Sequence, residues 1–236
     1  MTVDLAAWTA LAGGNQESGD CWARLIGRWS EPHRRYHGIA HLAAVLLFVD
    51  EYAEHAADPD AVRLAAWYHD AIYDPRAADN EEHSAALAET ELAALGLPQD
   101  RVQEVVRLIR LTATHAPGEG DRNGELLNDA DLMVLASPPE AYVAYVNAVR
   151  QEYAHVPDDD FRAGRAAVLD ALLAAPRLYR LQALAPAEAG ARRNLSAELI
   201  LLRPDPGAAG DPGDLGDASG DDAAPRGAAQ PGPPDH

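Results

Sequence analysis

Apolar residues recur along the chain at the three-to-four-residue spacing of amphipathic helices, almost without interruption as far as residue 202. Alternating β-branched runs, which would indicate strands, do not occur. We therefore expect an all-α fold, a globular bundle of several helices rather than one long coiled coil. The spacing predicts helices over about 3–12, 18–30, 37–56, 60–73, 80–95, 99–114, 125–136, 137–155, 158–174 and 186–202.

Two of these helices carry capping signals at their starts. In Ser137-Pro-Pro-Glu140, serine is in place to act as the N-cap, with proline in the first turn and glutamate at the capping-box position. Asn80 is a plausible N-cap for the helix that follows it. Glu81 and Glu82 then fall in the first helical turn, where the helix dipole favours carboxylates.

The helical pattern ends after Leu202. Residues 203–236 consist mainly of Pro, Gly, Ala and Asp, and Leu215 is the one large apolar residue among them. Such a segment buries too little surface to offset the entropy lost on ordering. We expect a folded domain over 1–202 and a disordered, Pro/Gly/Ala/Asp-rich acidic tail over 203–236.

The charge balance limits the possible partners. The formal net charge is −19, and all 19 basic side chains are arginines. A chain this acidic repels phosphate backbones at long range, so we expect no nucleic-acid duplex as a partner. A small phosphorylated molecule stays compatible with the sequence where arginine or a metal ion reverses the local charge.

Other features point to a cytoplasmic location. Cys21 is the only cysteine, so an intrachain disulfide cannot form and a reducing compartment is expected. The first residues lack the basic start and apolar run of a signal peptide. The longest apolar stretch, residues 42–49, is too short to cross a bilayer, so we expect no membrane partner.

Histidine and carboxylate side chains occur at spacings that bring them together on the predicted helices. His37 and His41 are four residues apart and would share one face of a helix. His69 and Asp70 are adjacent near the end of the helix over 60–73. Neighbouring side chains on a helix splay by about 100°, so this pair can flank one point.

Two further carboxylates, Asp129 and Asp131, lie near the start of another predicted helix. Imidazole and carboxylate together form the ligand set of Zn²⁺, Fe²⁺ or Mn²⁺. Such groups are costly to bury without a partner, and one metal ion satisfies several of them at once. For any single histidine taken alone, a hydrogen-bonded core residue is the competing interpretation.

The order His41…His69-Asp70…Asp131 resembles the H…HD…D signature of the HD superfamily of metal-dependent phosphohydrolases. Over about residues 20–202 the chain is most similar to the bacterial group of predicted HD-superfamily phosphohydrolases. The stretches that carry this similarity are RRYHGIAHL, AAWYHDAIYDP, DNEEHSA, LTATH, NDADLMVL, VRQEYAHV and ARRNLSAEL.

This resemblance implies an HD-domain bundle with one divalent ion bound by His41, His69, Asp70 and Asp131. It implies hydrolysis of a small phosphate ester or nucleotide by metal-activated water. Asp70 would also bridge to a second ion or orient the nucleophile. Mn, Fe, Co, Zn and Mg all stay open as the metal, and the number of ions, the substrate and the oligomeric state are not specified.

The stretch YHGIAH also resembles the YHN-x-x-H segment of cyclic-nucleotide phosphodiesterases. There the second histidine binds metal and the first donates a proton to the leaving oxygen. Carried over, His41 is a ligand and His37 a general acid. The Asp131-Leu132 pair favours Asp131 over Asp129 as the last ligand, and Asp129 would cap the helix or lie in the second shell. The second half of the phosphodiesterase His-Asp motif is missing, so cyclic nucleotides are not implied.

Two more residues are candidates for supporting roles. His115, in LTATH, would contact phosphate or help to hold a second metal, or would simply lie at a helix C-terminus. Glu82 would hydrogen-bond a ligand histidine or a metal-bound water, or would only favour the helix dipole. His83 is expected on the surface.

Arginine is the remaining way to hold phosphate in a chain without lysine. We expect Arg35 and Arg150 to contact substrate, with Arg34 and Arg165 as further candidates. For each of them a surface salt bridge is the competing interpretation. Three tyrosines are expected to line the cleft or to form the wall of the core: Tyr36, Tyr68 and Tyr73.

Two other functions fit the same residues. The first is a di-iron oxygenase on the HD fold, which needs additional histidines between His69-Asp70 and Asp131, where only His83 and His115 are available. The second is a non-catalytic module in which the metal is structural or the site binds a nucleotide.

Overall fold

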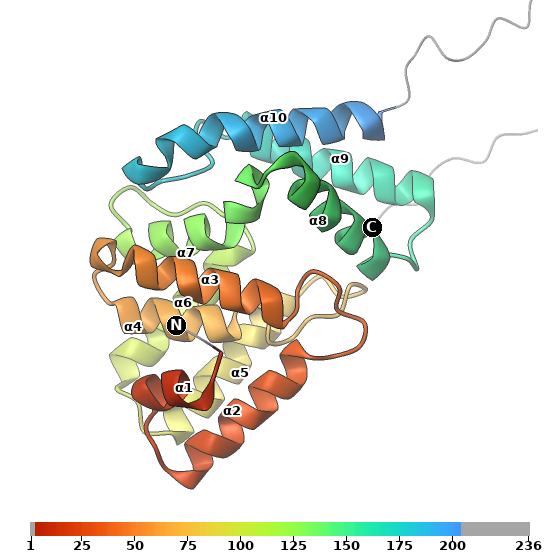
Figure 1. Ribbon diagram of the computed structural model, residues 1–236. Coiled ribbons are helices and arrows are strands. Elements are labelled where there is room, and N and C mark those ends of the chain that lie inside the picture. The colour runs from red at the N-terminus through yellow and green to blue at the C-terminus, as the bar shows by residue number, and fades with distance from the viewer. Residues whose placement is uncertain (1–2, 204–236) are drawn as a thin grey trace, which may run out of the picture. The chain divides into compact units, whose positions relative to one another are not determined.

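Ten α-helices joined by short loops make up most of the chain over residues 3–203, the part that the computed structural model describes (Figure 1). Within these residues there is no strand, so the all-α prediction is confirmed. The acidic tail predicted from residue 203 lies outside the described residues except for Arg203. The helices are α1 (Leu5–Ala12), α2 (Gln16–Trp29), α3 (Ile39–Glu51), α4 (Pro59–Tyr68), α5 (Asn80–Ala94), α6 (Gln99–Thr112), α7 (Arg122–Leu132), α8 (Pro139–Glu152), α9 (Asp158–Ala174) and α10 (Ala185–Leu202).

Helix α4 lies at the centre of the packing. It contacts α3, α5, α6 and α7. From Ala61 to Tyr68, every side chain except that of Arg63 is buried. A helix that is apolar on all sides belongs in the interior of a fold. The chain therefore carries His69, the residue after α4, directly into the core, where it is 1% exposed.

Helix α3 shows how the sequence pattern determines this packing. Leu42, Val45, Leu46 and Val49 follow the spacing of one helical face, and all four are buried. His41 adjoins this face and is buried with it. Burying four such aliphatic side chains contributes on the order of 2 kcal/mol each before entropy is counted.

The C-terminal helices form a second group beside this centre. Helices α9 and α10 pack on each other, and α10 also packs on the short 3₁₀ helix Met133–Ala136 that follows α7 (Figure 1). A buried ion pair between Arg165 of α9 and Glu198 of α10 joins the pair, with N–O distances of 2.7 and 3.0 Å. Arg165 is therefore a structural residue here and not a substrate contact.

Several predicted boundaries were wrong. Gly38, in extended conformation, precedes α3, so His37 does not share a helix with His41. Helix α4 ends at Tyr68, which leaves Asp70 in a turn. Ser137 does not cap α8, because Pro138 occupies the N-cap position. Asn80 is the first residue of α5 and instead hydrogen-bonds the backbone N–H and carbonyl of Asp74.

Cys21 lies in the core on α2 and forms no disulfide. Its thiol lies 3.2 Å from the Tyr68 hydroxyl and 3.3 Å from a Glu91 carboxylate oxygen. Burial raises the pKa of the Cys21 thiol to about 12, so the group is protonated at neutral pH. Tyr68 is accordingly part of the core rather than of a cleft.

None of the helices among the described residues is both long enough and apolar enough to cross a membrane. This agrees with the shortness of the apolar runs in the sequence.

Candidate functional site

Three side chains from distant parts of the chain converge inside the bundle. His41 comes from α3, His69 from the end of α4 and Asp131 from α7, and one ligand atom of each lies within 4.8 Å of the others. His41 Nε2 is 3.2 Å from His69 Nε2 and 3.1 Å from Asp131 Oδ1, and His69 Nε2 is 3.6 Å from the same oxygen. Such a cluster has the donors that a divalent ion requires.

Asp70 adds a fourth donor to this cluster. Its Oδ2 lies 3.4 Å from His69 Nε2 and 4.0 Å from His41 Nε2. Ligands about 2.1 Å from an octahedral ion are about 3.0 Å apart when adjacent and about 4.2 Å apart when opposite. The separations among His41, His69 and Asp131 lie between these limits, so these three side chains fit around a single ion, and Asp70 lies beside the two histidines at similar separations.

The orientation of His69 is set by the backbone. Its Nδ1 lies 2.9 Å from the carbonyl oxygen of Ala66 and donates to it, because a carbonyl can only accept. The Nε2 atom of the neutral ring then presents its lone pair to the cluster. Metal-binding histidines are commonly fixed in this way by a carbonyl or carboxylate on the other ring nitrogen.

Arg34 holds the turn that carries Asp70. Its buried guanidinium donates to the carbonyl oxygens of His37, Asp70 and Ala71 at 2.8–3.2 Å. It also pairs with Glu31. Arg34 therefore fixes the approach of both the segment before α3 and the turn after α4, and it is not free to bind substrate.

Burial and nearby charges shift the pKa values of the cluster residues in opposite directions. Burial lowers the pKa of His41. Burial also acts to lower the pKa of His69, yet the nearby carboxylates of Asp70 and Asp131 raise it to about 9. The pKa of Asp131, which burial alone would raise, is held well below its ordinary value by His69 and His41. Without a metal the carboxylates thus retain a proton on His69, and a divalent cation would replace that proton.

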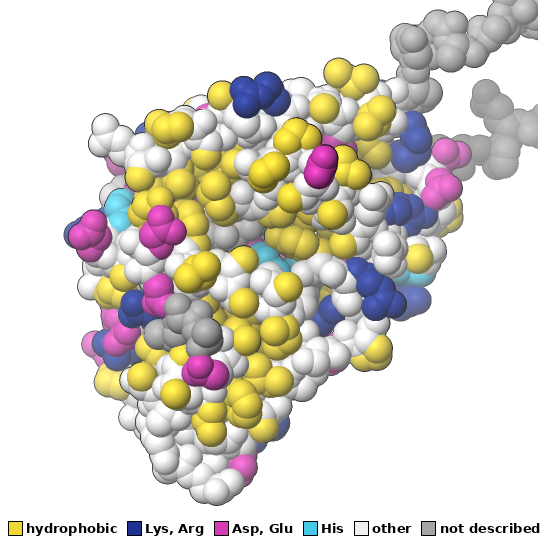
Figure 2. Space-filling view, viewed as in Figure 1, with side chains coloured by type: hydrophobic (Ala, Val, Ile, Leu, Met, Phe, Trp, Pro, Cys, Tyr) yellow, Lys and Arg dark blue, Asp and Glu magenta, His cyan; other side chains and the backbone are white. Residues whose placement is uncertain are grey.

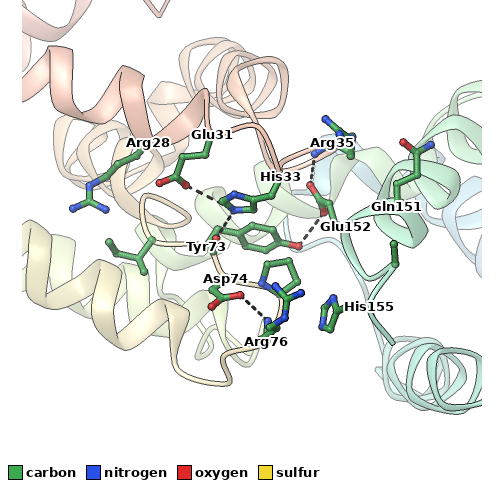
Figure 3. Close-up of a pocket in the computed structure, with 13 residues that line it drawn as sticks. Arg28, Glu31, His33, Arg35, Tyr73, Asp74, Arg76, Gln151, Glu152 and His155 are labelled. Atoms are coloured by element: carbon green, nitrogen blue, oxygen red, sulfur yellow. Dashed lines mark hydrogen bonds and ion pairs between the residues drawn. The ribbon is translucent and has the colours of Figure 1, made fainter. Parts of the chain in front are cut away.

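His37 lies beside the cluster and is held by a carboxylate that the sequence analysis did not identify. Its Nδ1 lies 2.7 Å from Glu152 Oε2 at the end of α8, which leaves Nε2 as the nitrogen free to face a ligand. The Tyr73 hydroxyl donates to the same carboxylate oxygen at 2.9 Å (Figure 3). The backbone N–H groups of Arg35, Tyr36 and His37 donate to the other oxygen at 2.6–3.0 Å.

Glu152 is fully buried at its carboxylate and has several donors. Burial alone would raise the pKa of Glu152. Contact with His37 and with backbone N–H groups instead lowers this pKa from 4.5 to about 2. A carboxylate held in this way keeps its charge at neutral pH.

This ionisation makes stability depend on pH. Because the folded pKa is depressed, the stabilisation is complete above about pH 5 and is lost as pH falls toward 2. At pH 7 we expect the free energy of unfolding of Glu152→Gln to be about 3 kcal/mol lower than that of the wild type. The difference from the wild type should shrink between pH 5 and pH 2, as measured by urea denaturation at a series of pH values.

Glu140→Gln provides the matched control, because Glu140 lies exposed on the same helix. Its unfolding free energy should stay within about 0.5 kcal/mol of the wild type at each pH. A gap between wild type and Glu152→Gln that does not change with pH would contradict the assigned ionisation of Glu152.

A polar cavity of about 270 Å³ opens onto the cluster. His37, Asp70, His115 and Asp131 line it, together with Glu81. The cavity is thus surrounded by the predicted general acid, two predicted ligands and the histidine predicted to contact phosphate or a second metal.

His115 reaches this cavity from the loop after α6. Its backbone has φ 49°, a left-handed conformation that is uncommon outside glycine. Its Nε2 lies 3.9 Å from Asp131 Oδ2, the carboxylate oxygen not directed at His41. Its Nδ1 is buried without a hydrogen-bond partner. The structure therefore brings His115 to the site, as expected.

The cluster is also bounded by an apolar hollow of about 360 Å³, which includes His41 and Asp131 in its lining. Tyr36, Phe48 and Met133 are among its apolar walls. Figure 2 shows histidine at the floor of a hollow that is bordered by hydrophobic side chains. An organic group carried by a ligand at the cluster would find apolar contacts here.

Two predicted second-shell carboxylates are engaged elsewhere. Asp129 is buried and accepts hydrogen bonds from the backbone N–H groups of Arg180 and Leu181 at 2.7–2.8 Å. It therefore neither caps α7 nor joins the cluster, and it anchors the segment before α10. Glu82 is exposed and forms an ion pair with Arg110 at 2.6 Å, while its neighbour Glu81 lines the cavity.

Three further candidates take different positions. Arg150 donates to the carbonyl oxygens of Tyr153 and Val156 and to Asp158, so it shapes the end of α8 rather than the cavity. Arg35 is exposed and donates to the Pro32 carbonyl, and it lines a hollow next to the site. His83 lies on the surface, as predicted, with its side chain 60% exposed.

Glu152 and Arg34 are the functional residues that the sequence did not assign correctly. Glu152 stands in VRQEYAHV, a stretch that carries the resemblance, but spacing alone does not connect it with a histidine 115 residues earlier. From the sequence, Arg34 was expected only as a candidate contact to phosphate, whereas its hydrogen bonds show a structural role.

Comparison of the chain with protein-family models, with curated proteins and with solved structures finds no match.

Proposed function

We propose that this chain is a metal-dependent phosphohydrolase acting on a small phosphate ester or nucleotide. One observation carries the proposal: two imidazoles and the Asp131 carboxylate come together, with the Asp70 carboxylate next to His69, beside a polar cavity that His37 also lines. The donor set suits Mn²⁺, Fe²⁺, Co²⁺, Zn²⁺ or Mg²⁺. When bound, the cation supplies Lewis-acid activation of water and charge neutralisation at the phosphoryl group.

Different residues have different roles around the bound phosphate. His41, His69, Asp70 and Asp131 hold the cation. Asp70, which is also in the cavity wall, orients the attacking water by accepting a hydrogen bond from it.

His37 has the position of a general acid. With Nδ1 held by Glu152, its Nε2–H donates a proton to the leaving oxygen as the phosphorus–oxygen bond breaks. Glu152 holds the ring in the orientation that directs Nε2 toward the cavity, as the carboxylate partner of a catalytic histidine does. His115, on another side of the cavity, contacts a phosphoryl oxygen.

The substrate's organic part lies in the apolar hollow formed by Tyr36, Phe48 and Met133. In this proposal the scissile bond lies between the apolar wall and the polar cavity. The acidity of the chain disfavours a nucleic-acid duplex as the substrate.

A di-iron oxygenase is a weaker fit to the same residues. Of the two histidines available between His69-Asp70 and Asp131, His83 is on the surface and only His115 reaches the cavity. A purely structural metal would not explain why His37, aligned by a buried carboxylate, faces the same cavity.

The test combines metal analysis with a substrate screen. Purified full-length protein is equilibrated with Mn²⁺, Co²⁺ or Mg²⁺, and bound metal is measured by elemental analysis. Phosphate or nucleoside release is then followed over a panel of monoesters, diesters and nucleotides. We expect about one ion per chain or more and turnover of at least one class. Protein that binds metal but is inert across the panel would refute the proposal.

A further inference from the structure

A second, larger hollow adjoins the polar cavity. It has a volume of about 610 Å³, within the range of small-molecule sites, and Tyr73 lines both spaces. Its basic side chains come from four separate segments (Figure 3). They are Arg28 on α2, Arg35 before α3, Arg76 between α4 and α5, His33 before α3 and His155 after α8.

The carboxylates that line this hollow already have partners. Glu31 pairs with Arg34 at 3.1 Å and lies 3.8 Å from His33. Asp74 accepts the backbone N–H of Arg76 at 3.0 Å. Glu152 is enclosed by the donors of the candidate site. The charges of Glu31 and Glu152 are therefore balanced by nearby donors, whereas Asp74 keeps its charge at the exposed edge of the hollow.

The guanidinium groups that line the hollow, by contrast, have no carboxylate partner. Over residues 3–203, Arg28 and Arg76 have no hydrogen bond or ion pair at the side chain, and Arg35 donates only to the carbonyl oxygen of Pro32. Many arginines elsewhere pair with a carboxylate, as Arg107 does with Glu104 and Asp121, whereas others, such as Arg177, contact only a carbonyl oxygen. What distinguishes Arg28, Arg35 and Arg76 is that three arginines without a carboxylate partner line the same hollow in a chain with net charge −19.

We propose that this cationic hollow, defined by Arg28, Arg35 and Arg76, binds a phosphate group of a small anionic molecule. Guanidinium groups bind phosphate oxygens in a fork geometry, and arginines from three different segments line this hollow. None of the four cluster residues lines this hollow, so phosphate binding there is testable without turnover, although its assignment to a second phosphate of the substrate rests on the proposed function. Its ligand is either a second phosphate group of the substrate or a separate small phosphate compound.

Titration with inorganic pyrophosphate tests the proposal directly. The full-length protein is titrated calorimetrically at low ionic strength, alongside the double variant Arg28→Gln/Arg76→Gln. Both arginines lie at the surface, so the substitutions should leave the fold intact. We expect binding by the wild type and at least about tenfold weaker binding by the double variant.

Two controls isolate the hollow. Arg177→Gln/Arg193→Gln removes the same charge from exposed positions elsewhere, and it should bind within about twofold of the wild type. Asp131→Asn alters the metal cluster and should still bind pyrophosphate. The proposal fails if the wild type does not bind at millimolar pyrophosphate, if Arg28→Gln/Arg76→Gln binds as tightly as the wild type, or if Asp131→Asn alone abolishes binding.

Kinetics then distinguish the two sources of the phosphate. If the hollow holds a second phosphate of the substrate, Arg76→Gln should raise KM for bisphosphate substrates and leave KM for monophosphates unchanged. If it holds a separate ligand, Arg76→Gln should leave KM unchanged for both, and pyrophosphate should not compete with either.

Discussion

Asp131→Asn is expected to reduce bound divalent metal to a small fraction of the wild-type amount and to lower phosphate release by more than about 100-fold. The reason is geometric and electrostatic. One oxygen of Asp131 lies within 3.6 Å of both ligand histidines, and the other faces His115. Asparagine retains the shape but removes the charge that offsets a cation. Elemental analysis and phosphate release on the same preparation measure both effects.

Glu82→Gln is the matched control, since it also removes one carboxylate charge near the cavity. Its side chain is 57% exposed and pairs with Arg110, so metal content and activity should stay near wild type. Asp129→Asn provides a second comparison. It should destabilise the chain while leaving metal binding in place, because Asp129 contacts only backbone and Asn128. If Asp131→Asn kept a full complement of metal, the assigned ligand set would be wrong.

Arg34→Met is expected to lower the free energy of unfolding by about 3–5 kcal/mol. Methionine fills much of the same volume but leaves the carbonyl oxygens of His37, Asp70 and Ala71 without their donor, and Glu31 without its partner. It also removes the contacts of the guanidinium with the Trp29 and Tyr73 rings. Urea denaturation provides the measurement.

Arg35→Met is the natural comparison. It removes the same charge at the neighbouring position, where the arginine side chain is exposed. Its effect should stay within about 0.5 kcal/mol. Arg34→Lys should recover only part of the loss, since an ammonium cannot contact several carbonyls in the fork geometry of a guanidinium. Equal stability of Arg34→Met and Arg35→Met would show that Arg34 does not hold the turn.

The positions of the helices could be predicted from sequence because burial repeats at the helical period. Leu42, Val45, Leu46 and Val49 are an example, and α3 is found where they indicate it. The ends of helices were less predictable. Ser137 has the residue type of an N-cap, but the N-cap position is Pro138 and the helix begins at Pro139.

The candidate cluster was predictable for a different reason. The residues alone indicated only that histidines and carboxylates share helices, and the set His41, His69, Asp70 and Asp131 came from the resemblance to the H…HD…D signature. The structure groups His41, His69 and Asp131, with Asp70 next to His69. Their role as metal ligands stays a prediction.

The supporting residues could not be predicted, because their contacts cross long stretches of chain. Nothing in the spacing links Glu152 to His37, or tells Arg34 apart from Arg35. Glu82 and Arg150 had suitable chemistry, but nearer partners hold them.

The single thiol of the protein has a practical consequence. Because Cys21 is enclosed between Tyr68 and Glu91 and is protonated at neutral pH, alkylating reagents would find no reactive thiolate in the native chain. Opening of the α2 region would uncover it, so one residue provides a built-in reporter for loss of structure without any engineered label.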